Sequence, residues 1–134
     1  MLYDYNYHCT HCNQRLNEGR DVYFLVGYND DDKFRIKLSK VPGVFGHIAE
    51  HTNAIKEGDI VNFYCSKCER DLRSQERPDL VQITLRVNDS IDYPLFISPV
   101  CGERLSYLLL NDELVSYSRH FFSILNNPIK GKAC

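Results

Sequence analysis

Two short cysteine motifs constrain this chain more than any other feature of its sequence. Cys9 and Cys12 form one C-x-x-C pair, and Cys65 and Cys68 form the other. The tight turn that this spacing permits lets two thiolates bind one ion while backbone N–H groups point at the sulfurs. Two such turns supply the closed tetrahedral site typical of structural zinc, so the sequence predicts one zinc ion bound by all four cysteines. The segment between the pairs is too long for a compact zinc finger and must itself be folded.

Other uses of the cysteines remain open. Redox-active C-x-x-C motifs follow a strand and open a helix, and residues 13–16 and 69–72 have some helical character. Iron bound by the same four thiolates is a second, less favoured alternative. Cys101 and Cys134 have no evident histidine partner, and we expect them to be packing and tail cysteines rather than reactive thiols.

The surroundings of the two cysteine pairs are also duplicated. The stretch "NYHCTHCNQRL" at 6–16 matches "NFYCSKCERDL" at 62–72, so that Asn6 corresponds to Asn62. Further along the chain, the apolar alternation of residues 22–43 recurs in phase at 81–102. Phase is informative because a slip of one residue would turn every side chain to the other face of the sheet. The sequence therefore predicts one domain made of two tandem repeats that meet at the metal, at residues 1–64 and 65–125.

The alternation of apolar and polar residues predicts a mainly β fold in which each repeat has a knuckle, a hairpin and a closing strand. The expected closing strands are "GDIVNFY" at 58–64 and "DELVSYS" at 112–118, which resemble each other. Two short helices and a frayed tail complete the prediction. The predicted hairpins are 21–28 with 33–40, 80–87 with 93–98, and 103–110 with 113–118, the predicted helices are 43–55 and 118–125, and the tail is 126–134.

Charge and hydropathy argue against several broad classes. The formal net charge is −2 and the pI is near 6.2, which is not the usual electrostatic signature of a general nucleic-acid binder. Purely apolar runs such as residues 108–110 are far too short to span a bilayer, and the N-terminus lacks the pattern of a signal peptide. We therefore expect a cytoplasmic protein without membrane contact, where thiols and metal ligands are commoner than disulfides.

With two C-x-x-C knuckles at hairpin-like turns joined by β structure, the chain resembles the zinc-ribbon class, including small uncharacterised bacterial zinc-ribbon proteins. The resemblance implies zinc bound by the four knuckle cysteines and a structural or interaction role. It covers the ligands and little else, and the class hosts many unrelated functions. The usual knuckle has Gly directly after its second Cys, where this chain has Asn13 and Glu69. Because Glu adopts the left-handed conformation poorly, we expect the second turn to differ from the first.

Histidines near the motifs are weaker candidates for the metal site. His8 and His11 flank the first knuckle, but four cysteines already complete a tetrahedron, so we expect these side chains to surround the site or face solvent. His47 and His51 have the four-residue spacing of two zinc ligands on a helix. No Glu follows His47 directly and no third ligand is evident, so surface histidines are the better interpretation.

A set of basic residues offers a second type of surface. Lys33, Arg35 and Lys37 are expected to project from the face of their strand opposite to its apolar residues, and Arg70 and Arg73 lie near the second knuckle. Together with neighbouring tyrosines they are candidate contacts for single-stranded nucleic acid or for a partner protein. A solvated charged face, or a sheet edge protected by lysine, is the alternative.

These observations favour a non-enzymatic zinc-binding module that acts through protein–protein interaction. No Ser-His-Asp order, Gly-rich phosphate loop or paired-carboxylate motif stands out in the sequence. One alternative is a nucleic-acid-binding zinc-ribbon protein that uses the basic strand face, and another is a redox or iron-binding four-cysteine protein. Exposed sheet edges would also allow a homodimer.

Overall fold

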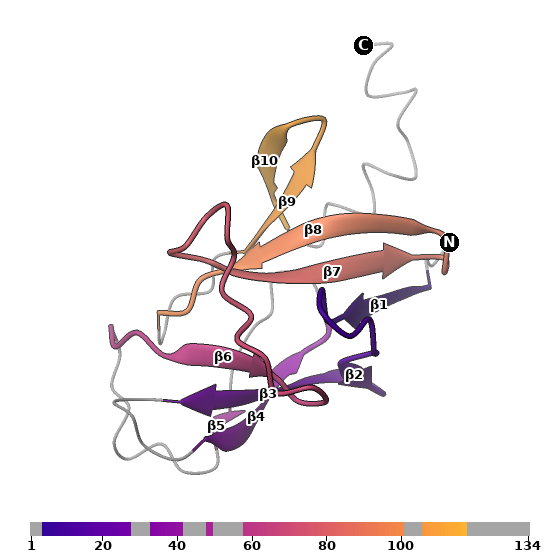
Figure 1. Ribbon diagram of the computed structural model, residues 1–134. Coiled ribbons are helices and arrows are strands. Elements are labelled where there is room, and N and C mark those ends of the chain that lie inside the picture. The colour runs from indigo at the N-terminus through magenta and orange to yellow at the C-terminus, as the bar shows by residue number, and fades with distance from the viewer. Residues whose placement is uncertain (1–3, 28–32, 42–47, 50–57, 101–105, 118–134) are drawn as a thin grey trace.

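The computed structural model describes residues 4–27, 33–41, 48–49, 58–100 and 106–117. This part of the chain forms an open fold of two antiparallel sheets and contains no helix, which confirms the prediction of a mainly β protein. The sheets lie as an upper and a lower layer in Figure 1. Within the described ranges, no helix is long and apolar enough to cross a membrane.

The upper sheet has five antiparallel strands, in the order β1 (Tyr5–His8), β7 (Val81–Val87), β8 (Ile91–Ile97), β9 (Ser106–Leu110) and β10 (Glu113–Ser116). Side chains in β7 alternate strictly between buried and half-buried positions. This period of two is the pattern of a strand with one face on the core, and it is the pattern that the sequence predicts there. The upper sheet therefore turns one apolar face toward the lower layer.

The lower sheet consists of β2 (Asn17–Glu18), β3 (Asp21–Gly27), β4 (Phe34–Ser39) and β5 (Ile48–Ala49), with β6 (Asn62–Cys65) paired to β3. Both β2 and β6 pair with β3 along one edge, at opposite ends of the strand, while β4 pairs with its other edge. The second cysteine knuckle thus begins on a strand that is held by the lower sheet.

Strands are present for all three predicted hairpins, with bounds that differ by a few residues. The strands β7 and β8 are joined by a shorter connection than predicted, because Val87 pairs directly with Ile91. Two of the turns use an Asn-Asp pair in the left-handed conformation, with φ angles of 53° at Asn88, 57° at Asp89, 49° at Asn111 and 65° at Asp112. Asn and Asp tolerate this conformation, and two consecutive left-handed residues match the twist of the flanking strands.

Each cysteine knuckle carries the chain from one sheet to the other. The first knuckle leads from β1 in the upper sheet to β2 and β3 in the lower sheet, whereas the second leads from β6 in the lower sheet to β7 in the upper sheet (Figure 1). The two crossings therefore run in opposite directions between the layers. An ion bound by both knuckles would tie these crossings to each other.

Strand pairing follows one scheme in two halves of the chain, which we call unit one (β1–β5) and unit two (β6–β9). Tyr7 in β1 pairs with Leu85 in β7. In the other unit, the counterpart of Tyr7 is Phe63 in β6, and it pairs with Val26 in β3, which is the counterpart of Leu85. The pairs β4–β5 and β8–β9 also correspond, since Ile36 pairs with Ala49 as Leu95 pairs with Leu108. The knuckle strand of each unit therefore pairs with a strand of the other unit.

The helix predicted for residues 43–55 is wrong at Ile48–Ala49, which form β5 and pair with β4. The exposed edge of β4 offers backbone partners to this segment, and the isoleucine favours a strand over a helix. The rest of that range lies outside the described residues, as do the helix predicted at 118–125 and the tail 126–134.

The two predicted closing strands do not occupy equivalent positions. The first ends in β6, which pairs with β3 of the preceding unit. The second contains β10, which pairs with β9 through a tight turn. The similarity of these segments therefore lies in their sequence alone, since β6 alternates between half-buried and buried residues whereas β10 is mostly exposed. The structural counterpart of β6 is β1.

The core lies between the two layers and includes a pair of buried tyrosines. Tyr7 and Tyr117 are each 1% exposed, and their hydroxyl oxygens are 2.6 Å apart. Tyr7 donates a hydrogen bond of 2.6 Å to the carbonyl of Lys40, so the hydroxyl of Tyr117 is the donor to Tyr7. Burial raises the pKa of both hydroxyls, which keeps them protonated. The polar tips of two large core residues are thus satisfied by each other and by the backbone.

Candidate metal centre

The two knuckle turns bring four thiols together, which we call the thiol cluster. The Sγ atoms of Cys9, Cys12, Cys65 and Cys68 all lie within 4.8 Å of one another. The Sγ atoms of Cys9 and Cys68 are 3.8 Å apart, as are those of Cys12 and Cys65. Four sulfurs at about 2.3 Å from a central ion form a tetrahedron with an edge of roughly 3.8 Å. The thiol cluster therefore fits a four-coordinate ion that prefers sulfur ligands.

Backbone N–H groups point at the first sulfur of each knuckle. The N–H groups two and three residues after Cys9 lie 3.3 Å and 3.5 Å from its Sγ. The corresponding groups after Cys65 lie 3.2 Å and 3.3 Å from its Sγ. These two cysteines are buried, whereas Cys12 and Cys68 are half-buried. Hydrogen bonds of this kind favour the thiolate form that a metal ligand requires.

Both knuckles close through the same left-handed residue position. Asn13 and Glu69 each have a φ of 62°. Their N–H groups donate to the carbonyls of Cys9 and Cys65 at 2.9 Å and 3.0 Å. The expectation that the second turn differs is therefore wrong. The hydrogen bonds of the turn hold Glu69 in a conformation that costs a non-glycine residue about 1–2 kcal/mol.

This strain at Glu69 leads to a prediction about stability. The substitution Glu69→Gly is expected to raise the free energy of unfolding by about 1 kcal/mol, because glycine adopts a positive φ without the clash of a Cβ atom. Urea denaturation with the metal present measures the change. Asn13→Gly is the matched control and should gain less, since asparagine tolerates the conformation and its side chain has a hydrogen-bond partner. An equal or smaller gain at Glu69 would contradict the prediction.

Burial and hydrogen bonding shift the pKa values of the thiols in different directions. Burial raises the pKa of Cys9 to about 12, against the hydrogen bonds that its Sγ accepts from the backbone. Burial also raises the pKa of Cys65. At Cys12 burial acts in the same direction, but the N–H of Gln14 and the neighbouring thiols outweigh it and lower the pKa. Binding of an ion by all four thiolates must therefore displace protons from the buried members.

Two histidines lie beside the thiol cluster without being part of it. The Nε2 atom of His11 is 3.1 Å from the carbonyl oxygen of Asp71, which connects the first knuckle to the second. The Nδ1 atom of His8 is 3.0 Å from the carbonyl oxygen of Asn13. Each ring nitrogen can donate a hydrogen bond to the oxygen next to it. The histidines thus support the turns, as expected for residues around a complete set of four ligands.

Sequence reasoning missed Arg86, which connects unit two to the first knuckle. Its guanidinium donates to Oδ1 of Asn13 at 2.7 Å and to both carboxylate oxygens of Asp92 at 2.7 Å and 3.1 Å. This hydrogen-bonded cation holds the pKa of Asp92 below its ordinary value. Arg86 reaches the knuckle because β7 pairs with β1, and that pairing has no signal in the local sequence.

The basic residues predicted on the strand at 33–40, which forms β4 from Phe34 to Ser39, have partners within the protein. Side chains alternate along this strand as predicted, with Arg35 exposed and its neighbours on the other face buried or half-buried. The Nζ atom of Lys33 lies 4.1 Å from the ring centroid of Tyr64, and Cζ of Arg35 lies 4.2 Å from that of Tyr23. Lys37 lies 4.0 Å from a carboxylate oxygen on β3. The cations therefore cover one face of each of these two aromatic rings.

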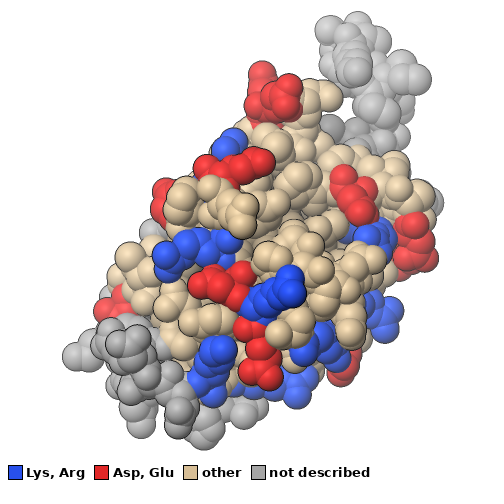
Figure 2. Space-filling model, in the orientation of Figure 1, with Lys and Arg blue, Asp and Glu red and all other residues tan. Residues whose placement is uncertain are grey.

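The second predicted basic cluster lies beside the second knuckle. Arg73 donates a hydrogen bond of 2.9 Å to Oδ1 of Asn62. Arg70 is exposed, and its carbonyl accepts the N–H of Cys65 at 3.0 Å. Acidic and basic side chains are interspersed on the face of the molecule shown in Figure 2. The positive charge on this face is therefore not continuous, because acidic side chains lie between the basic ones.

The structure brings together the four cysteines that the sequence predicts as ligands. Four other cysteines and histidines that the sequence analysis considered lie outside the described residues: Cys101, Cys134, His47 and His51. The geometry of the thiol cluster is compatible with a metal site like that of a zinc ribbon. No family model, no curated protein and no solved structure matches this chain, so the assignment of the site rests on its geometry.

Proposed function

We propose that this protein is a non-enzymatic zinc-binding module in which the metal is structural and which acts through contacts with another protein. The supporting observation is the thiol cluster, whose four Sγ atoms lie within 4.8 Å of one another, with two of their separations at the 3.8 Å edge of a tetrahedral site. Four protein ligands complete this geometry and leave no position for a water or a substrate. A metal in such a site holds the fold together.

The position of the cluster indicates what the metal would hold. Each knuckle connects the two sheets, and the crossings run in opposite directions. The β1–β7 and β3–β6 pairs have only four residues of register each, so these contacts between the units are short. A single ion bound by both knuckles would therefore close the interface between the units at the point where strand pairing ends.

We also infer that the two units arose by tandem duplication. The hydrogen bonds of the first knuckle correspond one by one to those of the second, and the strand registers of unit one correspond to those of unit two. In such an arrangement, neither unit has a complete metal site alone. Both the site and the interface then require the two units together.

The metal content of protein purified under native conditions tests this function. We expect one zinc ion per chain by mass spectrometry and no visible absorption, because zinc has a filled d shell. A coloured protein with one iron per chain would support the redox alternative and contradict the zinc proposal. Less than half an equivalent of any metal in protein with all thiols reduced would contradict a structural metal altogether.

Binding of single-stranded nucleic acid remains a prediction without a supporting contact. A stacking platform needs free aromatic faces within a positive groove. Here, cations of the protein itself lie over Tyr23 and Tyr64, and acidic residues interrupt the positive charge on the face in Figure 2. A protein partner is therefore the better proposal for the described surface.

A further inference from the structure

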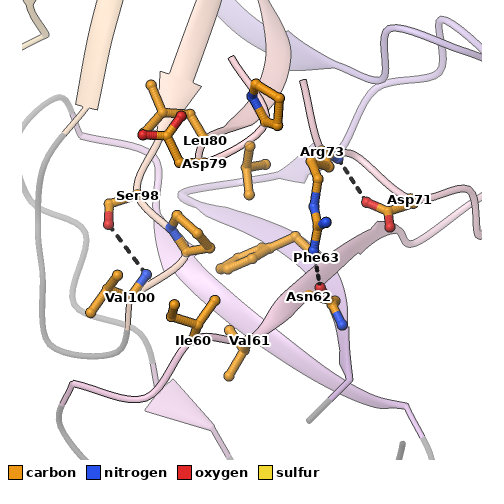
Figure 3. A pocket seen from close by; sticks show the side chains of 13 residues that line it. Ile60, Val61, Asn62, Phe63, Asp71, Arg73, Asp79, Leu80, Ser98 and Val100 are labelled. Atoms are coloured by element: carbon orange, nitrogen blue, oxygen red, sulfur yellow. Dashed lines mark hydrogen bonds between the residues drawn. The ribbon is translucent and has the colours of Figure 1, made fainter. Parts of the chain in front are cut away.

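A pocket of about 380 Å³ opens between the two sheets beside β6. Its wall is mainly apolar and includes Val61, Phe63, Leu80, Pro99 and Val100. Figure 3 shows the ring of Phe63 between these side chains, with Arg73 and Asp71 on one side of the pocket. The volume is within the usual range for a bound ligand or a large inserted side chain.

The two units correspond in part around this pocket. The counterpart of Phe63 is Tyr7, and residues 98–100 correspond to residues 39–41. In unit two the N–H of Val100 donates to Oγ of Ser98 at 3.2 Å, and in unit one the corresponding bond has a length of 3.1 Å. This turn of the backbone therefore has the same local hydrogen bond at both places, whereas the bond of 3.1 Å from the N–H of Val61 to the carbonyl of Pro99 has no counterpart among the described residues of unit one.

In unit one, the corresponding place holds the side chain of Tyr117. Its ring centroid is 6.3 Å from that of Tyr7 with an angle of 86° between the planes, which is an edge-to-face contact. The hydroxyls of the two tyrosines are 2.6 Å apart, and Tyr7 in turn donates to Lys40. An aromatic ring from outside the knuckle strand thus completes the core of unit one.

Unit two lacks this ring at the matching position of the chain. Ala49 and Leu108 are equivalent by their strand pairing. If the same offset is kept along the following sequence, the counterpart of Tyr117 is Gly58, which has no side chain. Phe63 is 7% exposed, whereas its counterpart Tyr7 is 1% exposed. The pocket in unit two is consequently the place where a ring equivalent to Tyr117 would pack.

We propose that this pocket binds a tyrosine side chain presented by a segment of a partner protein, in the position that Tyr117 occupies in unit one. The inference deepens the proposed interaction function and rests on it. The apolar wall would contact the ring, while the carboxylate of Asp79, which lines the same pocket, offers an acceptor for a hydroxyl at its polar rim.

A segment of polypeptide fits this site better than a free aromatic molecule. Ile60 lines the pocket and is 65% exposed, the highest value among the large apolar residues of the described chain. A ring alone would leave Ile60 in water, whereas the residues flanking a tyrosine could cover it. Burial of such an exposed apolar side chain next to an inserted aromatic anchor is typical of peptide recognition.

Titration of the full-length, metal-loaded protein with two peptides tests the proposal. Acetyl-Gly-Tyr-Gly-amide should shift the backbone NMR signals of Phe63, Leu80 and Val100 in a saturable way. Acetyl-Gly-Leu-Gly-amide should bind about tenfold more weakly, because it lacks edge-to-face ring contacts. Equal binding of both peptides, or shifts confined to residues away from the pocket, would overturn the proposal.

A matched pair of variants separates the pocket from the rest of the surface. Val100→Trp should fill the pocket and abolish the shifts, whereas Val41→Trp, at the corresponding position of unit one, should leave binding unchanged. Ile60→Ser, at an exposed position, is the second variant and should weaken the tyrosine peptide several-fold without altering the fold. Unchanged binding in both Val100→Trp and Ile60→Ser would overturn the proposal.

The metal content of the same samples distinguishes this inference from the function on which it rests. Protein with one zinc ion that fails to bind the tyrosine peptide contradicts the pocket proposal alone. Protein without metal contradicts the metal centre, whatever the peptide does.

Discussion

Removal of the metal is expected to unfold the protein or to loosen it markedly. The four sulfurs lie within 4.8 Å of one another, and two of the cysteines are buried. Without the metal, the four cysteines would no longer be connected to one another. The contacts that remain between the two units near the knuckles are the short β1–β7 and β3–β6 pairs. Structural zinc contributes about 10–16 kcal/mol to the folding of zinc-finger peptides. A loss of even half of this, about 5–8 kcal/mol, would match the whole stability of many domains.

The measurement is thermal denaturation followed by circular dichroism, before and after treatment with a strong chelator. We expect the melting temperature to fall by about 15 °C or more, since each kcal/mol corresponds to several degrees in a domain of this size. Restoring one equivalent of zinc should restore the original transition. A melting temperature that stays within about 2–3 °C although the metal is gone, roughly the effect of 1 kcal/mol, would show that the fold does not depend on the ion.

A substitution of one ligand should reproduce the effect of the chelator. Cys65→Ser removes a sulfur that accepts two backbone hydrogen bonds within the second knuckle, and we expect it to lower both metal content and melting temperature. Cys101→Ser is the matched control, because the sequence predicts no ligand role for that thiol. Similar losses in the two variants would mean that general thiol chemistry, and not the cluster, maintains the fold.

Acid should act in the same direction as the chelator. Because burial raises the pKa of Cys9 to about 12, this thiol is protonated at neutral pH in the metal-free protein. Metal binding must remove that proton, so protons compete with the ion. The stabilisation supplied by the metal is therefore greatest at alkaline pH and declines as the pH falls. Chelation at mildly acidic pH should require less chelator than chelation at neutral pH.

The sequence predicts most of the metal centre because its signals are local. A C-x-x-C spacing defines a turn, and two such turns in duplicated surroundings identify the four cysteines of the thiol cluster as candidate ligands before any contact is known. Alternation in residues 21–28 and 80–87 likewise reports that one face of each strand is buried. The left-handed conformation of Glu69 was missed because a residue preference of about 1–2 kcal/mol is smaller than the sum of the hydrogen bonds that form the turn.

The partner of each strand could not be predicted from such signals. Alternation shows which face is buried but not which strand lies alongside, so the exchange of β1 and β6 between the units has no signature in either segment. The contact of Arg86 with Asn13 depends on that exchange. The hydrogen bond between Tyr7 and Tyr117 joins residues that are far apart in the sequence. Similar sequences around β6 and β10 even suggested an equivalence that their partners contradict.

The substitution Phe24→Ala is expected to lower the free energy of unfolding by about 3–5 kcal/mol, which is the usual range for an aromatic residue removed from a core. Phe24 is fully buried in β3, and its ring makes an edge-to-face contact with Phe63, with centroids 5.3 Å apart. It is also the residue that pairs with Cys65, so it lies directly beside the second knuckle. Removal of its ring would leave a cavity between the sheets.

Leu25→Ala is the matched control, because Leu25 is the next residue on the same strand and is only half-buried, on the opposite face. We expect a loss of about 1 kcal/mol there, since much of its apolar surface stays in water. Urea denaturation with excess zinc measures both variants, and zinc content should stay at one equivalent because neither residue is a ligand. The comparison tests the register of β3, on which the pairing of β6 and the position of the second knuckle depend. If β3 were shifted by one residue, Leu25 would face the core, and Leu25→Ala would then be the more damaging substitution.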